Sequence, residues 1–151
     1  MIERIINPKP RFVTLSANSA GSGAPLATLL RQSFFAFDQD SLIHSITINS
    51  SFVCSGALSQ LIGAVAFSDS TTISVILPNV TQTALWIENL LNPAAGVISA
   101  SKSVFIDLDR YFAKSNTHIS CYLNGIGGVQ NGTINATVSF NTVEEWKNFK
   151  E

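Results

Sequence analysis

From Ser33 to Phe140 apolar and polar residues alternate along the chain, and this period of two constrains the fold more than any other feature. The clearest run is TINATVSF, residues 133–140, in which every second residue is apolar and those between are Thr, Asn or Ser. Successive side chains of a β-strand point to opposite faces, so the pattern predicts a strand with one buried and one wet face. Further strands are predicted at 33–37, 42–54, 62–68, 71–77, 84–91, 103–108 and 117–123.

Turn residues such as NPAAG (92–96) separate these eight runs, and no βαβ alternation is visible. Short strands at regular spacing predict a sandwich or a barrel, and eight is the number of strands in a jelly roll. The favoured fold class is therefore an all-β, antiparallel eight-stranded β-sandwich of jelly-roll type. An immunoglobulin-like sandwich is the chief rival, but the chain lacks its Cys…Trp…Cys spacing. Residues 84–91 are the least secure strand, because Leu85, Glu88 and Leu91 also fit a helical turn.

Residues 1–32 differ from the rest, and we interpret them as an N-terminal arm that precedes a β-sandwich domain of residues 33–151. NPKP and SANSAGSGAP are loop-forming segments, with a strand-like piece, RFVTL (11–15), between them. Two uses of such an arm stay open: it lies on a neighbouring subunit, or it packs on its own domain. In the first case, removal of residues 1–30 weakens assembly and leaves the β domain folded.

Two short helices are expected outside the alternating region. Residues 26–32 carry leucines at helical spacing just after Pro25, which suits the first turn of a helix. Residues 142–149 begin with Thr142, and Glu145 three residues later completes a capping box before an apolar stripe.

Charge and composition exclude several classes of function. Nine basic and ten acidic residues give a net charge of −1, and 19 Ser, 11 Thr and 12 Asn supply uncharged polarity instead. No basic stripe is available for nucleic acid, and no apolar run or basic amphipathic helix for membrane insertion. The N-terminal MIERIINPKPRF lacks the apolar stretch of a signal peptide, so we expect synthesis in the cytoplasm without export by that route.

The sequence shows no set of catalytic residues. His44 falls on the apolar side of its predicted strand and is interpreted as a satisfied histidine at the rim of the core. His118 is the only other histidine, and without a paired carboxylate motif the two form neither a metal site nor a triad. GSG (21–23) and GIGG (125–128) lack the context of a phosphate loop, and no G-x-S-x-G is present. We predict no catalytic, cofactor-binding or metal-binding residues, and hence no enzyme.

Two acidic pairs offer a weaker alternative. Asp38 with Asp40 and Asp107 with Asp109 have the spacing of loop carboxylates that bind calcium. No EF-hand spacing accompanies them, and an aspartate at the end of a strand is ordinary turn chemistry. The same acids could serve a glycosidase only if two of them faced each other across a cleft.

Cysteines and aromatic residues complete the candidates. Cys54 and Cys121 match no zinc or CxxC pattern and are interpreted as buried free thiols, with a disulfide between them left open. Trp86, Tyr111 and Tyr122 could stack on sugar rings, but burial in the core or in an interface is the favoured interpretation.

Taken together, the leading arm, the strands rich in Ser, Thr and Asn, the low charge and the lack of a catalytic set resemble single jelly-roll virion proteins. Such proteins include minor capsid, decoration and fibre-type proteins of bacterial viruses, and the resemblance covers residues 33–141 and the arm. It implies a homo-oligomer that contacts other virion or surface proteins through its arm, located in a virion or an assembled surface particle. The alternatives are a carbohydrate- or surface-ligand-binding sandwich module and, less favoured, a hydrolase on a sandwich scaffold.

Overall fold

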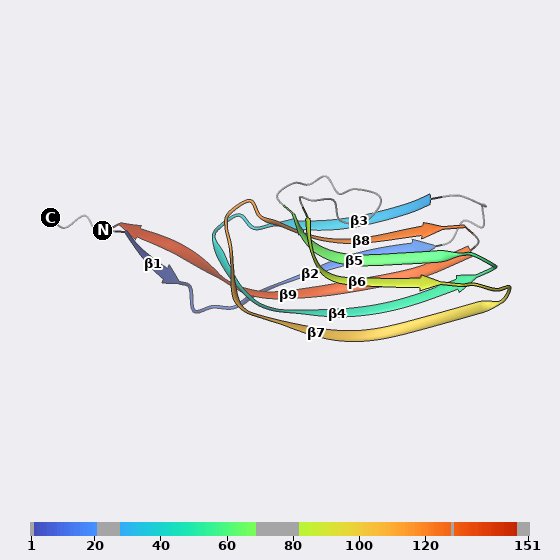
Figure 1. Ribbon diagram of the computed structural model, residues 1–151. Coiled ribbons are helices and arrows are strands. Elements are labelled where there is room, and N and C mark those ends of the chain that lie inside the picture. The colour runs from blue at the N-terminus through green and yellow to red at the C-terminus, as the bar shows by residue number, and fades with distance from the viewer. Residues whose placement is uncertain (1, 21–27, 69–81, 128, 148–151) are drawn as a thin grey trace.

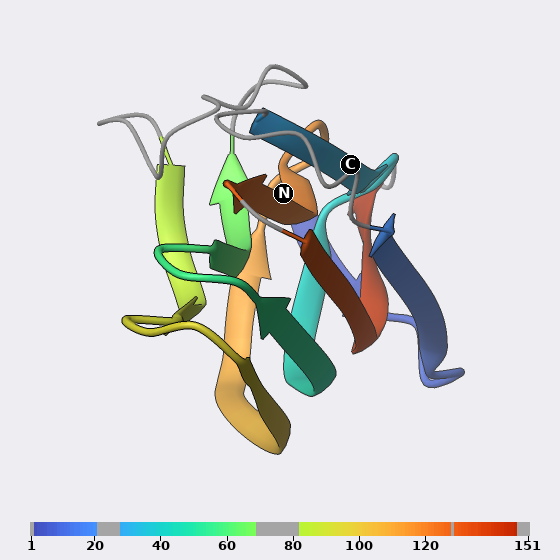
Figure 2. The ribbon, with the colours of Figure 1, turned by 90° about the vertical axis from the view of Figure 1, so that its right-hand side faces the viewer.

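The computed structural model describes residues 2–20, 28–68, 82–127 and 129–147, and in these ranges the chain is all β. Its strands form two antiparallel sheets that face each other as a sandwich, which confirms the predicted fold class (Figures 1 and 2). Within these ranges there is no helix of the length and apolarity that a membrane span requires. The strands are β1 (Ile2–Ile6), β2 (Arg11–Ala20), β3 (Thr28–Ala36), β4 (Ser41–Ser55), β5 (Gln60–Ser68), β6 (Gln82–Leu91), β7 (Val97–Ala113), β8 (His118–Ile126) and β9 (Val129–Lys147).

The strands pair from the outside of the chain inward. β2 pairs with β9, β3 with β8, β4 with β7 and β5 with β6, all antiparallel. One sheet has the order β2–β9–β4–β7, with β1 on the far end of β9, and the other has the order β3–β8–β5–β6. The chain is thus one long antiparallel hairpin, wrapped so that alternate strand pairs fall in opposite sheets. This is the connectivity of a jelly roll.

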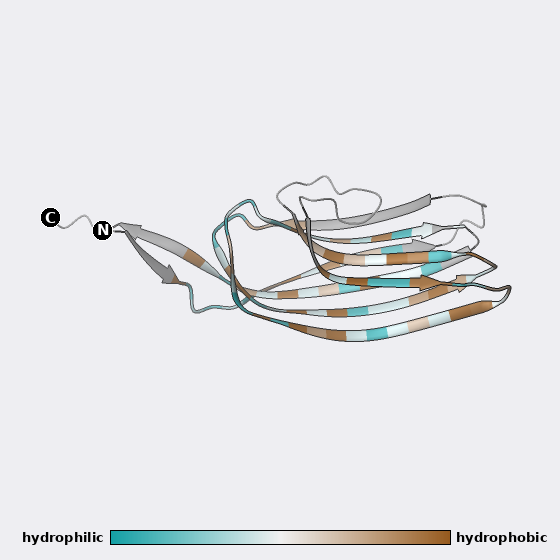
Figure 3. Ribbon diagram, in the orientation of Figure 1, coloured by the Kyte–Doolittle hydropathy of each residue, from teal (hydrophilic) through white to brown (hydrophobic). Residues whose placement is uncertain are grey.

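The core lies between the sheets and is built from the residues that the alternation singled out. In β9, Ile134, Ala136 and Val138 are fully buried, while the hydroxyl and amide residues between them face outward. Figure 3 shows the same banding of apolar and polar residues along β4, β7 and β9. Near the β3–β4 turn, the ring of Phe37 packs edge-on against that of Phe140 at 5.1 Å between centroids. The period of two therefore sorts residues between core and solvent as predicted.

The strand count differs from the prediction in two ways. Residues 84–91 lie in β6, so the strand prediction is confirmed and the helical alternative is wrong. β1 was not predicted, and the strand at 11–15 extends to residue 20 as β2. The predicted strand at 71–77 lies outside the described residues.

Both helix predictions are wrong where the structure describes the chain. Residues 28–32 belong to β3 and pair with β8, so Leu29 and Leu30 lie on a strand despite their helical spacing. Residues 142–147 continue β9, and residues 143–147 pair with β1 instead of forming part of a capped helix. Local capping and spacing signals are weak compared with a complete ladder of backbone hydrogen bonds to a neighbouring strand, and tertiary pairing overrides them.

The segment predicted as an arm contributes to the sandwich. β2 forms a ten-residue ladder with β9, and Leu15 and Ala17 belong to the core. The proposed division between residues 32 and 33 falls inside β3. We therefore expect removal of residues 1–30 to unfold the domain, which favours the second of the two uses left open by the sequence. Within residues 2–20, β1 is the strand that extends beyond the sandwich (Figure 1).

Candidate assembly surfaces

One end of the sandwich carries a group of exposed apolar residues, which we call the apolar tip: residues 56–59 in the β4–β5 turn and 91–97 around the β6–β7 turn. Leu58 is 71% exposed, Val97 67% and Leu91 49%. The small apolar residues of both turns are exposed as well, and neither segment contains a charged residue. This end lies at the right of Figure 1 and faces the viewer in Figure 2. Exposed apolar patches of this kind mark interaction sites.

Hydrogen bonds join the two turns into one rigid unit. Asn92 is buried, and its backbone N–H donates to the carbonyl of Ser59 at 2.9 Å while its own carbonyl accepts from the N–H of Leu58 at 2.8 Å. Its side-chain Nδ2 donates to the carbonyl of Gly96 at 2.9 Å. The N–H of Gly56 donates to the same carbonyl at 2.9 Å. The tip therefore holds its shape without a partner.

Leu58 occupies an unfavourable backbone conformation within this unit. Its φ is +62°, in the left-handed region that a leucine rarely adopts and that costs on the order of 1 kcal/mol or more. The surrounding hydrogen bonds hold it there with its side chain in solvent. A strained, rigid and exposed apolar residue is best explained by a contact that the isolated chain does not make.

A two-stranded ribbon, formed by β1 and residues 143–147 of β9, extends from the opposite end of the sandwich (Figure 1). Its root is fixed by hydrogen bonds. The N–H of Asn7 donates to the carbonyl of Thr142 at 2.9 Å, and Asn141 Nδ2 donates to the carbonyl of Asn7 at 2.8 Å. His44 Nε2 is hydrogen-bonded to Asn141 Oδ1. His44 is therefore a half-buried, satisfied residue at the edge of the core, as expected, and it helps to orient the ribbon.

The open edge between β6 and β7 is closed by an ion pair. Lys102 Nζ lies 2.7 Å from Glu88 Oε2, and the glutamate side chain is only 9% exposed. Both residues occupy core-facing positions, since their cross-strand partners Ser50 and Gly63 face the core. Inward-facing charges on edge strands oppose the addition of a further strand, because they would then be enclosed.

Removal of the lysine should destabilise the protein more than removal of both charges. In Lys102→Met the buried carboxylate of Glu88 loses its partner, and we expect the free energy of unfolding to fall by about 1–3 kcal/mol in urea denaturation. The double variant Glu88→Leu, Lys102→Met should recover most of this loss. Lys114→Met, at an exposed position, is the control, and an equal loss in that variant would contradict the assignment.

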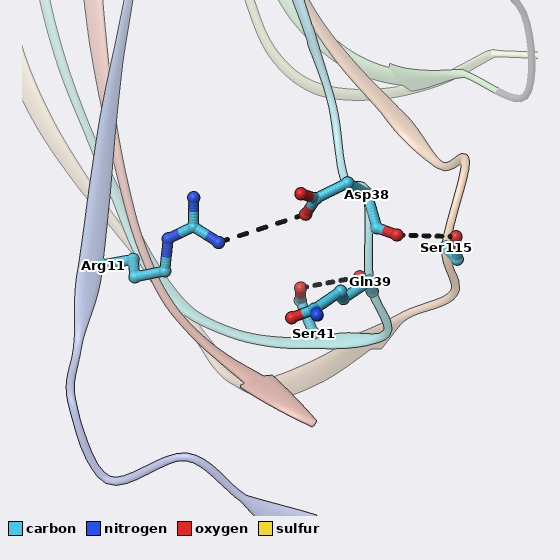
Figure 4. A network of polar contacts seen from close by, with 5 residues as sticks. All are labelled: Arg11, Asp38, Gln39, Ser41 and Ser115. Carbon is cyan, nitrogen blue, oxygen red and sulfur yellow. Dashed lines mark hydrogen bonds and ion pairs between the residues drawn. The ribbon is translucent and has the colours of Figure 1, made fainter. Parts of the chain in front are cut away.

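The acidic pairs take part in ordinary turn chemistry. Asp38 lies 4.0 Å from Arg11, and its carbonyl accepts a hydrogen bond from Ser115 Oγ at 3.1 Å (Figure 4). Asp40 Oδ1 accepts from the N–H of Ser115 at 2.8 Å. Asp107 Oδ1 accepts from the N–H of Asp109 at 2.9 Å, where β7 leaves the regular ladder. No cluster of three or more His, Cys, Asp or Glu that could hold a metal ion occurs among the described residues.

The remaining candidates belong mostly to the interior. Cys54 and Cys121 are buried and free. Burial raises the pKa of the Cys121 thiol to about 12, so it stays protonated and unreactive at neutral pH. Tyr122 is fully buried and cannot act as an exposed platform for sugars, whereas Trp86 is partly buried and packs against the core. Tyr111 is half exposed but stacks on Phe67 at 4.8 Å between ring centroids.

The sequence analysis missed the apolar tip. Residues 92–96 were predicted only as a turn, and GALS (56–59) lies between two predicted strands, where polar residues are usual. The signal that could have identified them is a pair of turns made almost wholly of Leu, Val, Pro, Ala and Gly. The pairing of the two turns, which makes one surface of them, depends on the jelly-roll connectivity.

No family model and no curated protein matches the chain. Among solved structures, it is similar to the VP2 subviral particle of infectious bursal disease virus, with 12% identity and a TM-score of 0.42 over 91% of this chain. The chain spans 38% of that protein. It is also similar to a chain of the virus-like particle of a nodavirus of the prawn Macrobrachium rosenbergii, with 8% identity and a TM-score of 0.43 over 99% of this chain and 98% of that one.

A third similar structure is a family 11 carbohydrate-binding module from Clostridium thermocellum, with 6% identity and a TM-score of 0.35 over 92% of this chain and 87% of that one. The viral structures named above come from infectious bursal disease virus and a prawn nodavirus, so they do not single out bacterial viruses. TM-scores below 0.5 support no functional conclusion, and the function is therefore proposed from the residues of the chain itself.

Proposed function

We propose that this chain is a structural protein that assembles with further copies of itself, with the apolar tip as the principal contact. The observation that carries the proposal is the rigid, charge-free tip, where Leu58 is held in solvent in a strained conformation. Full burial of one such leucine contributes about 2 kcal/mol to an interface. Association with a partner supplies the burial that the isolated sandwich cannot.

The partner is another copy of the chain because little opposes self-association. The net charge of −1 produces almost no repulsion between copies, whereas a charge far from zero keeps proteins apart. The ion pair of Glu88 and Lys102 disfavours pairing through the β6–β7 edge. The tip and the ribbon remain as contacts at opposite ends of the sandwich.

The finer identification, a capsid, decoration or fibre-type component of a virus particle, is part of the same proposal. It is supported by the jelly-roll connectivity, which viral capsid domains share with lectins and cupins. It is also consistent with the strand surfaces rich in Ser, Thr and Asn, which stay wettable in a dense array of subunits.

Light scattering behind a sizing column tests the proposal on the full-length chain. We expect a discrete mass that is a multiple of the monomer mass of 16.2 kDa and that is retained on dilution to low micromolar concentration. A mass of one monomer across the accessible concentration range would contradict assembly through the tip.

Deletion of β1 tests whether the ribbon contributes to assembly or to the stability of the fold. A variant that lacks residues 1–8 keeps β2 intact, and an isolated two-stranded ribbon adds little stability in water. We expect cooperative unfolding of the variant at nearly the midpoint of the full chain, together with an assembly that dissociates at higher protein concentration. Loss of cooperative unfolding would assign β1 to the fold, and unchanged assembly would show that the ribbon makes no contact.

A further inference from the structure

The outward surface of the sheet β2–β9–β4–β7 is almost free of charge. The strand register aligns its outward-facing residues into rows that run across the four strands. We call the four rows that follow the polar face, and all of its members except Phe12, Phe105 and Asp107 are Ser, Thr or Asn. The rows are Phe12–Ser139–Ser45–Asp107, Thr14–Thr137–Thr47–Phe105, Ser16–Asn135–Asn49–Ser103 and Asn18–Thr133–Ser51–Ser101.

Two asparagines at the centre of the polar face are held in a defined orientation. Ser16 Oγ donates to Asn135 Oδ1 at 2.7 Å, and Ser103 Oγ donates to Asn49 Oδ1 at 2.8 Å. Each serine lies on an edge strand and donates its hydrogen bond to the amide oxygen of its asparagine. Each amide therefore turns its NH2 group away from the edge strand, and an amide nitrogen is a donor only. Asn49 and Asn135 are direct cross-strand neighbours, so their Cβ atoms lie about 5 Å apart and both amides stand at the centre of the polar face.

Aromatic rings stand at both margins of the polar face. Phe105 on β7 is 66% exposed and pairs with Thr47, and Phe12 on β2 is 67% exposed and pairs with Ser139. An exposed phenylalanine beside hydroxyl groups offers an apolar surface next to directional hydrogen bonds. Both rings lie on edge strands, so a ligand that spans the sheet reaches a ring and the central amides together.

We propose that the polar face binds a neutral glycan. A sugar ring has an apolar face that packs on an aromatic ring and hydroxyl oxygens that accept from amide NH2 groups. Thirteen uncharged polar side chains match such a ligand, whereas an anionic glycan would need a cation, and the polar face contains none. This binding site is independent of the apolar tip and includes neither Trp86 nor Tyr122.

A glycan array that carries neutral, sialylated and sulfated oligosaccharides tests the proposal with the full-length protein. We expect binding to neutral oligosaccharides and a loss of about tenfold in affinity for Asn135→Asp. This substitution keeps the acceptor for Ser16 but removes the NH2 donors and places a charge on the polar face. Phe105→Ala should also weaken binding by about tenfold, because stacking is lost.

Asn89→Asp is the matched control. Asn89 lies on the exposed surface of β6 in the other sheet, and its Oδ1 accepts from Gln60 Nε2 at 2.9 Å, so the change has the same chemistry at a different place. We expect this variant to bind like the wild type. The absence of binding to any neutral glycan on the array, binding to charged glycans alone, or equal binding by all three variants would each overturn the proposal. Unchanged oligomeric mass and cooperative unfolding show that the fold and the assembly are intact in each variant.

Discussion

Leu58→Asn is expected to weaken assembly while it stabilises the individual subunit. Asparagine adopts positive φ more readily than leucine, so the strain at φ +62° is relieved, and the free energy of unfolding should rise by about 0.5–1 kcal/mol. The same change removes the most exposed large apolar side chain of the apolar tip. If burial of Leu58 contributes about 2 kcal/mol to each contact, the dissociation constant should rise about 30-fold.

The opposite signs of the two effects make the test specific. Light scattering over a concentration series measures assembly, and urea denaturation of the dissociated subunit measures stability. Ile87→Ser is the control, because Ile87 is 47% exposed on β6 and lies outside the tip. Equal weakening of assembly by Ile87→Ser, or assembly of Leu58→Asn at the wild-type concentration, would show that the tip is not the contact.

Gly63→Ala is expected to destabilise the core strongly. A Cβ at this position would lie 2.4 Å from Ile134 Cδ1 and 2.6 Å from Phe52 Cζ, and both side chains are fully buried. The side chains of Ile134 and Phe52, which come from the facing sheet, already fill the space next to Gly63, so an added methyl group must displace them. We expect a loss of about 3 kcal/mol in the free energy of unfolding, at the upper end of the usual range for overpacking.

A second substitution can restore the space. Ile134→Val shortens the side chain nearest to the new methyl group, so the pair Gly63→Ala, Ile134→Val should be more stable than the sum of the single effects predicts. Chemical denaturation of the four proteins in this cycle measures the coupling. A loss below about 0.5 kcal/mol for Gly63→Ala would mean that the side chains of Ile134 and Phe52 move aside at little cost.

The sequence predicts the interior of this protein better than its ends. The alternation along TINATVSF identifies Ile134, Ala136, Val138 and Phe140 as core residues because side-chain direction in a strand depends only on the period of two. The ends of the chain carry conflicting local signals. Thr142 and Glu145 fit a capping box, yet this segment pairs with β1 across almost the whole length of the chain, and no local rule includes that partner.

The candidate surfaces were harder to predict for the same reason. Leu58 and Val97 are far apart in sequence, and only the pairing of β4 with β7 brings their turns together. The polar face likewise consists of residues from four strands. Composition reveals that the chain is rich in Ser, Thr and Asn, but only the register shows that Asn49 and Asn135 are neighbours. The burial of Tyr122 could not be predicted either. Both faces of β8 are buried, whereas an alternation with a period of two indicates one buried face and one exposed face.

The outside-in order of strand pairing has a consequence for how the chain reaches its fold. Thr14 meets Thr137 across a separation of 123 residues, and a topology dominated by such distant pairs folds slowly. During synthesis the strands near the middle of the chain can pair early, whereas β2 must wait until β9 has been made. Leu15 and Ala17 are without their partner strand until then, so we expect the closure of β2 on β9 to limit the rate of folding.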